Sequence, residues 1–228
     1  MVHETMINKT VTNSNKTNRT HIANKIRKEK LVAIIRLDKQ KDIASVVKCL
    51  ISGGVACLEI TSNTPGFTEE ISKARAQYPD ILIGAGTIIN KTLAQQAIEA
   101  GAQFLVTPNT DKSIVKIAHK HNLPVLMGAL TPTDIAKAIN YNADFIKIFP
   151  AGTFGIKYFK DLQGPFSDTS FIPVGGINID NISDWFNAGA IGVGIGNDLT
   201  RAVNNQEEQN ILIALVKNYM EKIKILTK

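Results

Sequence analysis

Lys147 is the residue of this sequence with the clearest capacity for chemistry. It lies in the segment DFIKIFP (144–150), a short apolar run that predicts a buried strand. An unpaired ammonium group is costly in an apolar interior, and it commonly escapes that cost by losing its proton. A neutral lysine amine is a nucleophile. The sequence therefore predicts an amine held ready to attack a carbonyl group.

Three further polar side chains, Arg36, Glu59 and Thr87, stand at or near the ends of other apolar runs. A carboxylate such as Glu59 can shuttle the protons that carbinolamine formation and dehydration require. Arg36 and Thr87 offer hydrogen-bond donors for a substrate carboxylate. Each charge alone is equally consistent with a solvated strand end, or with a salt bridge from Glu59 to Arg36 or Lys147. Charges at matching heights on three different strands indicate a site instead.

Glycine-rich turns follow the last two apolar runs, at Gly175-Gly176 and at Gly196-Asn197. Exposed backbone N–H groups there, with the start of a short helix predicted at 197–201, can hold a phosphate dianion. The alternative is that the double glycine only makes a tight turn. We expect the substrate to be phosphorylated and to be gripped by these four residues.

Short apolar segments that alternate with longer amphipathic ones must position these residues. Eight strands are predicted, at 31–36, 56–60, 81–84, 104–107, 125–128, 145–149, 171–174 and 191–195. Helices are predicted at 22–30, 41–53, 66–77, 90–100, 111–120, 132–140, 154–162, 180–188 and 206–226. Eight strand–helix units predict an α/β fold, a single (β/α)8 TIM barrel, because a doubly wound sheet usually has fewer strands. Functional side chains of this fold project from the C-terminal ends of the strands.

The chain of 228 residues carries a formal charge of +6, of which +5 lies in residues 1–30. Residues 1–20 are polar without an apolar period and predict a disordered extension, which leaves 21–228 as the barrel domain. The body therefore offers no basic field for nucleic acid. We expect neither a nucleic-acid nor a membrane partner.

No apolar run approaches the roughly 20 residues of a membrane helix, and no apolar segment near the N-terminus resembles a signal peptide. A cytoplasmic location is therefore expected. Cys49 and Cys57 stand outside any CxxC pair and away from any histidine cluster, so free buried thiols are predicted rather than a disulfide or a metal site.

Four motifs in order, LEIT (58–61), GAGT (84–87), KIFP (147–150) and GGI (175–177), resemble the class I 2-keto-3-deoxy-6-phosphogluconate (KDPG) aldolase family over residues 25–203. That family includes bifunctional 4-hydroxy-2-oxoglutarate aldolases. The resemblance implies cleavage of a 2-keto-3-deoxy-6-phospho sugar acid to pyruvate and glyceraldehyde 3-phosphate, by a homotrimer without metal. It assigns the Schiff-base lysine to Lys147, the glutamate to Glu59 and the carboxylate-site threonine to Thr87.

Two departures from the gluconate-type pattern stand out. Asn63 occupies the position of an arginine, so Arg36 is expected to supply that cation, and Val174 replaces a threonine before the double glycine. A valine at this position is more similar to the pattern of the branch that acts on the C4 epimer, 2-dehydro-3-deoxy-6-phosphogalactonate (KDPGal). A polar-to-apolar change beside the C4 hydroxyl can shift preference by only about 1 kcal/mol, so the epimer stays open.

The mechanistic hypothesis is an iminium between Lys147 and the substrate ketone, with Glu59 removing the C4 hydroxyl proton and with Pro108 and Phe149 walling the pyruvate portion. One alternative is a phosphate-binding barrel isomerase or epimerase with Glu59 as base and Lys147 acting only electrostatically. The other is a non-catalytic binder of a phosphorylated ligand.

Overall fold

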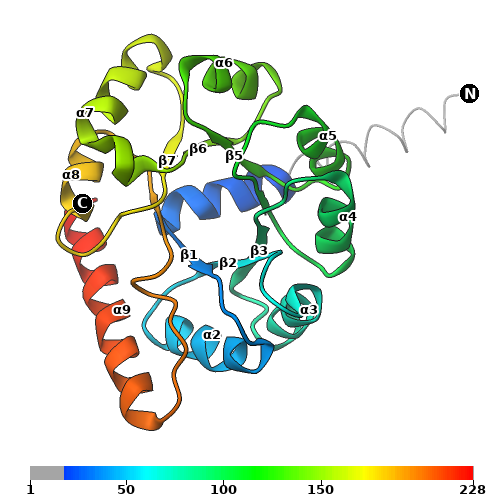
Figure 1. The fold of residues 1–228 in the computed structure, drawn as a ribbon, viewed down its shortest axis with the longest axis vertical. Coiled ribbons are helices and arrows are strands. Elements are labelled where there is room, and N and C mark those ends of the chain that lie inside the picture. The colour runs from blue at the N-terminus through cyan, green and yellow to red at the C-terminus, as the bar shows by residue number, and fades with distance from the viewer. Residues whose placement is uncertain (1–17, 228) are drawn as a thin grey trace, which may run out of the picture.

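The computed structural model describes residues 18–227, in which eight parallel strands form one sheet (Figure 1). The strands are β1 (Leu31–Ile35), β2 (Cys57–Thr61), β3 (Leu82–Gly86), β4 (Leu105–Val106), β5 (Val125–Ala129), β6 (Phe145–Ile148), β7 (Phe171–Pro173) and β8 (Val193–Ile195). They pair in the order β7-β6-β5-β4-β3-β2-β1-β8, and a parallel bridge between Val174 and Gly194 joins the two ends. The predicted (β/α)8 barrel is confirmed.

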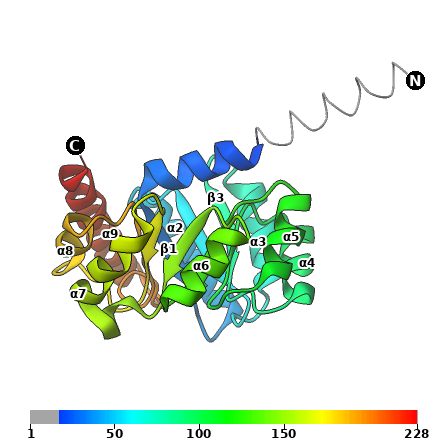
Figure 2. The same ribbon diagram turned by 90° about the horizontal axis from the view of Figure 1, so that it is seen from above.

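Helices follow the strands and surround them on the outside (Figures 1 and 2). The α-helices are α2 (Ile43–Ser52), α3 (Phe67–Gln77), α4 (Lys91–Glu99), α5 (Lys112–Lys120), α6 (Pro132–Asn140), α7 (Ala151–Gln163), α8 (Ile182–Asn187) and α9 (Gln206–Leu226). Two 3-10 turns, η1 (Gln40–Asp42) and η2 (Gly164–Phe166), precede α2 and follow α7. All eight predicted strands and the helices between them exist, with ends shifted by a few residues.

Side-chain alternation along the strands divides the apolar residues between two cores. In β6, Phe145 belongs to the barrel interior, whereas Ile146 and Ile148 face the surrounding helices. Because the period of a strand is two residues, Lys147 also points into the barrel. The interior core contains Val32, Ile34, Cys57, Leu82, Phe104, Val106, Leu126, Phe145, Ile172 and Val174.

A helix that includes residues 18–29 lies across the end of the barrel where the strands begin (Figure 2). Its residues Ile22, Ala23 and Ile26 are buried against the interior core and close that end. The helix is already formed at residue 18, earlier than the predicted start at 22, and most of the predicted disordered extension lies outside the described residues.

Asp144, just before β6, connects several elements at this closed end of the barrel. Its carboxylate accepts a hydrogen bond from Val125 N at 2.9 Å and lies 3.0 Å from His119 Nε2. It also forms an ion pair with Arg19 Nε at 3.1 Å, so the N-terminal helix is anchored to β5, β6 and α5.

Two predictions near the site are corrected. Residues 197–199 form a single hydrogen-bonded turn, in which Leu199 N and Thr200 N both donate to Gly196 O, and no helix is present at 197–201. Helix α7 starts at Ala151 rather than at 154, and it is interrupted at Gly155, whose φ of 77° and ψ of 176° are not helical.

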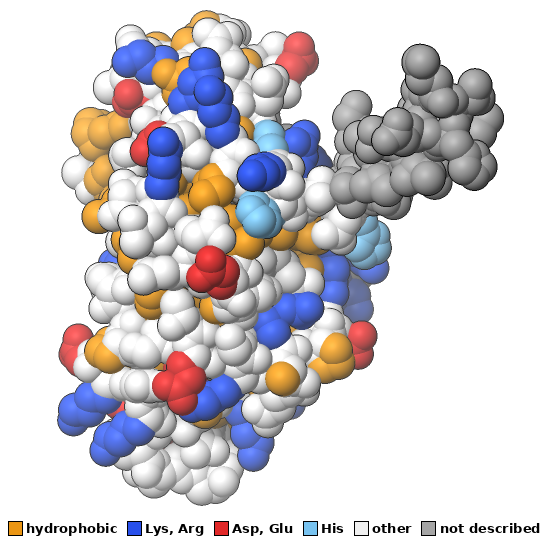
Figure 3. Space-filling model, turned by 90° about the vertical axis from the view of Figure 1, so that its right-hand side faces the viewer, with side chains coloured by type: hydrophobic (Ala, Val, Ile, Leu, Met, Phe, Trp, Pro, Cys, Tyr) orange, Lys and Arg blue, Asp and Glu red, His pale blue; other side chains and the backbone are white. Residues whose placement is uncertain are grey.

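The outer face formed by α4 and α5 has mixed charge. Figure 3 shows Lys and Arg side chains over its upper part, with acidic side chains among and below them. A groove there is lined by Lys91, Asp111, Lys112, Ser113, Lys116, Ile117 and Lys120. Within residues 18–227, no helix is both long and apolar enough to cross a membrane.

Candidate active site

Lys147 lies inside the barrel near the C-terminal end of β6, and only 6% of the residue is exposed. Its Nζ lies 5.3 Å from the centre of the Phe149 ring, and no carboxylate of the described residues comes within 4.0 Å of it. Burial lowers the pKa of Lys147, and the Arg36 guanidinium lowers it further, against the opposing charge of Glu59. The amine is therefore neutral over a wider pH range than an exposed lysine, and it lines an open cavity.

Glu59 points into the same interior from β2, and it is 1% exposed. Its Oε1 is buried without a hydrogen-bond partner in the described part of the chain. Burial raises the pKa of Glu59, while Lys147 and Arg36 pull that pKa back down. A carboxyl group poised in this way can both take and return a proton. The predicted alternative of a direct salt bridge is not found among residues 18–227, since neither cation lies within 4.0 Å.

Arg36 and Thr87 stand together at the mouth of the barrel, after β1 and β3. Arg36 Nη2 donates to Thr87 Oγ1 at 3.3 Å. Thr87 has a φ of 56°, which is rare for a β-branched residue and marks a functional or strained position. Its backbone N–H has no hydrogen-bond partner among the described residues. A guanidinium, a hydroxyl and a free N–H are therefore available to one carboxylate.

The turns after β7 and β8 present backbone N–H groups on the other side of the mouth. Gly175 and Gly176 have φ values of 93° and 76°, a conformation that side chains other than glycine adopt only with strain. The N–H groups of these two residues, of Gly196 and of Asn197 have no partner within the described chain. Such a group of N–H dipoles suits an anion. The carbonyls of Val174 and Gly175 are turned away and accept from Ala151 N and Gly152 N.

A cavity of about 730 Å3 joins the two halves. It is lined by Ile34, Arg36, Asn63, Thr87, Pro108, Lys147, Phe149, Val174, Gly175, Gly176, Ile177, Asn178, Gly194, Gly196, Asn197 and Asp198. An amine with a lowered pKa thus lies between the Arg36–Thr87 pair and the turns with free backbone N–H groups. This arrangement suits a keto acid that carries a second anionic group.

The model of the KDPG and KHG aldolase family matches residues 22–214, most of the chain. The chain belongs to this aldolase family. The 2-dehydro-3-deoxy-6-phosphogalactonate aldolase of Escherichia coli is 33% identical over 196 residues, covering 85% of this chain and 96% of the relative. The 2-dehydro-3-deoxy-phosphogluconate aldolase of Haemophilus influenzae is 35% identical over 165 residues, covering 72% and 78%.

Solved structures give the same relationship for the aldolase fold. A structure described as native KDPGal superimposes with a TM-score of 0.77 at 32% identity and covers 85% of this chain and 96% of its own. The KDPG aldolase of Legionella pneumophila, solved with pyruvate captured as a covalent carbinolamine, has a TM-score of 0.74 at 25% identity and covers 86% and 94%. The chain is a class I aldolase and hence a lyase, and the isomerase and binder alternatives are not favoured.

The structure brings together ten of the eleven predicted site residues of this aldolase on the cavity wall, while Glu59 lies beneath the wall. Sequence reasoning missed Ile34 and Gly194 as lining residues, although each lies on a strand two positions before a predicted site residue. Asn178 and Asp198 were also missed, because loop residues follow no period. Asp198 accepts a hydrogen bond from the buried Tyr219 of α9.

Residues 18–227 contain no group of three or more His, Cys, Asp or Glu side chains that could hold a metal ion. Cys57 is buried in the barrel interior, and burial raises the pKa of its thiol.

Proposed function

We propose that this aldolase cleaves a 2-keto-3-deoxy-6-phospho sugar acid, KDPG or its C4 epimer KDPGal, into pyruvate and glyceraldehyde 3-phosphate. The observation that carries the proposal is the buried Lys147 amine, which lines a cavity between two anion-binding regions. Arg36 and Thr87 suit the C1 carboxylate, and the turns at Gly175-Gly176 and Gly196-Asn197 suit the C6 phosphate.

In the proposed mechanism the neutral amine of Lys147 attacks the C2 ketone, and the carbinolamine loses water to give an iminium. Glu59, directly or through a water, then removes the C4 hydroxyl proton. The C3–C4 bond breaks, and its electron pair moves to the iminium nitrogen to form an enamine as the aldehyde leaves. Protonation of the enamine at C3 and hydrolysis of the imine release pyruvate and restore Lys147.

Burial supports both the nucleophilic role of Lys147 and the proton-transfer role of Glu59. It lowers the pKa of Lys147, which favours the nucleophilic form, and it raises the pKa of Glu59, which suits a group that alternates between acid and base. Phe149 and Pro108 wall the pyruvate portion. The phosphate contacts supply binding energy remote from the reacting bond, and this energy orients C3 and C4.

Val174 is the residue proposed to influence the C4 epimer. It is 6% exposed, lines the cavity and packs at the bridge with Gly194. An apolar side chain there gives no hydrogen bond to a substrate hydroxyl, whereas threonine would. The similarity to the E. coli galactonate aldolase over 96% of that relative supports the galactonate epimer as a substrate, alongside the gluconate epimer.

We further propose that the enzyme acts in the cytoplasm as a homotrimer, without metal, nucleic acid or membrane, and with residues 1–20 as an extension outside the barrel. The family resemblance supports the trimer. A solved cage designed by fusing symmetric oligomeric domains is 33% identical, with a TM-score of 0.78, over 86% of this chain and 74% of its own.

Reductive trapping tests the proposed Schiff base. The enzyme is incubated with pyruvate and borohydride, and the modified residue is located by mass spectrometry of peptides. We expect an adduct on Lys147 in the wild type, none in Lys147→Met, and an undiminished adduct in Lys112→Met, which removes an exposed lysine of α5. An unmodified Lys147, or full turnover of substrate in the presence of borohydride, would refute the mechanism.

A further inference from the structure

The segment around Arg36 is held by the last residue of β2 and by the loop that follows it. Arg36 itself lies outside the regular strand, and its guanidinium is exposed at the cavity mouth. Thr61 and Thr64 are nevertheless buried beside it, with 0% and 1% exposure. Buried hydroxyl groups require partners, and these two find theirs on the residues that flank Arg36.

The two hydroxyls form a chain of hydrogen bonds from one side of Arg36 to the other. Leu37 N donates to Thr64 Oγ1 at 3.4 Å, and the Oγ1 atoms of Thr64 and Thr61 are 2.9 Å apart. Thr61 Oγ1 then donates to Ile35 O at 3.2 Å. One consistent set of donors closes the chain, because each hydroxyl accepts once and donates once.

Ser62, from the same loop, holds the second half of the carboxylate-binding pair. Ser62 Oγ donates to Thr87 O at 2.8 Å, and Ser62 N donates to Gly86 O at 2.8 Å. These bonds fix the backbone of Thr87 in its left-handed conformation. One loop therefore contacts Thr87 and a residue that flanks Arg36, and Arg36 and Thr87 are the two residues proposed to bind the substrate carboxylate.

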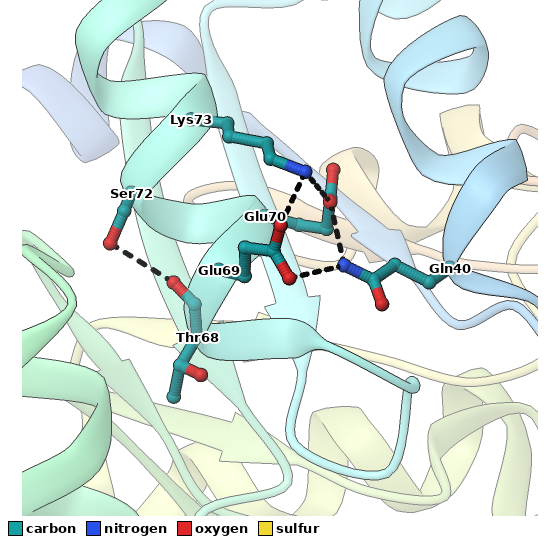
Figure 4. Close-up of polar contacts among 6 residues, drawn as sticks. All are labelled: Gln40, Thr68, Glu69, Glu70, Ser72 and Lys73. Carbon is teal, nitrogen blue, oxygen red and sulfur yellow. Dashed lines mark hydrogen bonds and ion pairs between the residues drawn. The ribbon is translucent and has the colours of Figure 1, made fainter.

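A second tie holds the far end of the segment after β1. Gln40 Nε2 donates to Glu69 Oε2 at 2.8 Å and to Glu70 Oε1 at 3.0 Å, in the first turn of α3 (Figure 4). Lys73 Nζ lies 2.7 Å from Glu69 and 2.9 Å from Glu70, so the two carboxylates share two donors. The segment from Arg36 to Gln40 is thus fastened at both ends to the β2–α3 unit.

We infer that Thr64 is a positioning residue for the aldolase reaction, which acts through Arg36 by fixing its backbone, and that Ser62 does the same for Thr87. This inference rests on the proposed function, because it requires that Arg36 and Thr87 bind the carboxylate of the keto acid. Small displacements of such donors have large effects, since binding and reaction both depend on their geometry.

The test compares Thr64→Val, which keeps the shape and removes the hydroxyl, with Thr64→Ser, which keeps the hydroxyl. Pyruvate and acetone serve as probes in borohydride trapping on Lys147, because both have a ketone and only pyruvate has a carboxylate. We expect Thr64→Val to raise the half-saturating pyruvate concentration roughly 10-fold, the scale of a hydrogen bond to a charged group. Trapping by acetone stays unchanged, and Thr64→Ser restores pyruvate affinity.

A double-substitution experiment separates positioning from general damage. In an Arg36→Met background, we expect Thr64→Val to cause no further loss of pyruvate affinity, because the guanidinium that Thr64 positions is absent. Ser62→Ala still causes a loss in that background, since it acts through Thr87. Gln40→Met, at the other end of the segment, is the second single variant. We expect it to weaken the binding of pyruvate and to leave trapping by acetone unchanged.

Three results would overturn the inference. They are unchanged pyruvate affinity in a folded Thr64→Val protein, an equal loss for pyruvate and acetone, or an undiminished effect of Thr64→Val in the Arg36→Met background. If Thr64→Val does not fold, Ser62→Ala decides, because unchanged pyruvate affinity in that variant overturns the inference for the other half of the pair. Failure of wild-type Lys147 to trap either ketone would instead refute the proposed Schiff base, so the two failures are distinguishable.

Discussion

Glu59 Oε1 occupies the space that a side chain at position 86 would need, since a β-carbon built on Gly86 would lie 1.6 Å from it. Gly86 of β3 therefore leaves the space that the side chain of Glu59 of β2 occupies. It lets the buried carboxylate pack against the backbone of the neighbouring strand. The GAGT motif thus contributes a space as well as the threonine that ends it.

Replacing Gly86 by alanine is expected to displace the Glu59 carboxylate and to lower kcat by about 100-fold, because general acid–base catalysis typically supplies that much or more. The measurement is steady-state cleavage of either epimer, with circular dichroism to verify the fold. Gly164→Ala is the matched control, since a β-carbon there meets no atom within 4 Å. Wild-type kcat in a folded Gly86→Ala protein would contradict the role of Glu59.

Substitutions of Glu59 and Arg36, the two charged residues that act on Lys147, should shift the pKa of Lys147 in opposite directions. Glu59 raises the pKa of Lys147 and Arg36 lowers it. In Glu59→Gln the pKa of Lys147 falls, and the rising limb of trapping rate against pH moves to lower pH. In Arg36→Met the limb moves to higher pH. Acetone with cyanoborohydride is the probe, because it has no carboxylate for Arg36 to bind. Shifts of the same sign would show that these charges do not control the amine.

Val174→Thr is expected to shift the ratio of kcat/KM toward the gluconate epimer by about 5-fold, because one neutral hydrogen bond near the C4 hydroxyl is worth about 1 kcal/mol. The assay compares both epimers side by side in wild type and variant. Val174→Ile, which stays apolar, is the control for altered packing. An unchanged ratio in Val174→Thr would place epimer selection elsewhere in the cavity.

Gly175→Ala should weaken phosphate binding, since its φ of 93° strains any side chain and the N–H groups would shift. We expect KM for the phosphorylated substrate to rise at least about 10-fold, the loss of one charge-assisted hydrogen bond. Half-saturation by pyruvate, which has no phosphate, should stay at the wild-type value. A parallel loss for pyruvate would mean that this turn supports the whole site rather than the phosphate.

Asp144→Asn should lower the free energy of unfolding by about 2 kcal/mol, because this carboxylate serves a backbone N–H, His119 and Arg19 at the closed end of the barrel. Denaturant unfolding measures the loss. The value of kcat at 25 °C should be unchanged, because Asp144 lies at the opposite end of β6 from the cavity. A fall in kcat at full stability would be inconsistent with this separation.

Much of this architecture was predictable from the sequence because a parallel barrel imposes two simple periods. Alternation in β6 places Lys147 with Phe145, and strand ends place Arg36 near Thr87, so most of the cavity wall was predicted. Contacts across loops were not predictable. The chain from Leu37 through Thr64 and Thr61 to Ile35 depends on loop conformation, and so does the turn at 197–199, where Asn197 suggested a helix N-terminus.

The helix over residues 18–29 covers one end of the barrel, whereas Lys147 is buried inside it and Asn197 is exposed at the cavity mouth. In the proposed binding mode, the phosphate-bearing fragment therefore lies nearer the mouth than the fragment bound to Lys147. We expect the aldehyde to leave first in cleavage. In the reverse direction, we expect pyruvate to be bound to Lys147 before the aldehyde arrives.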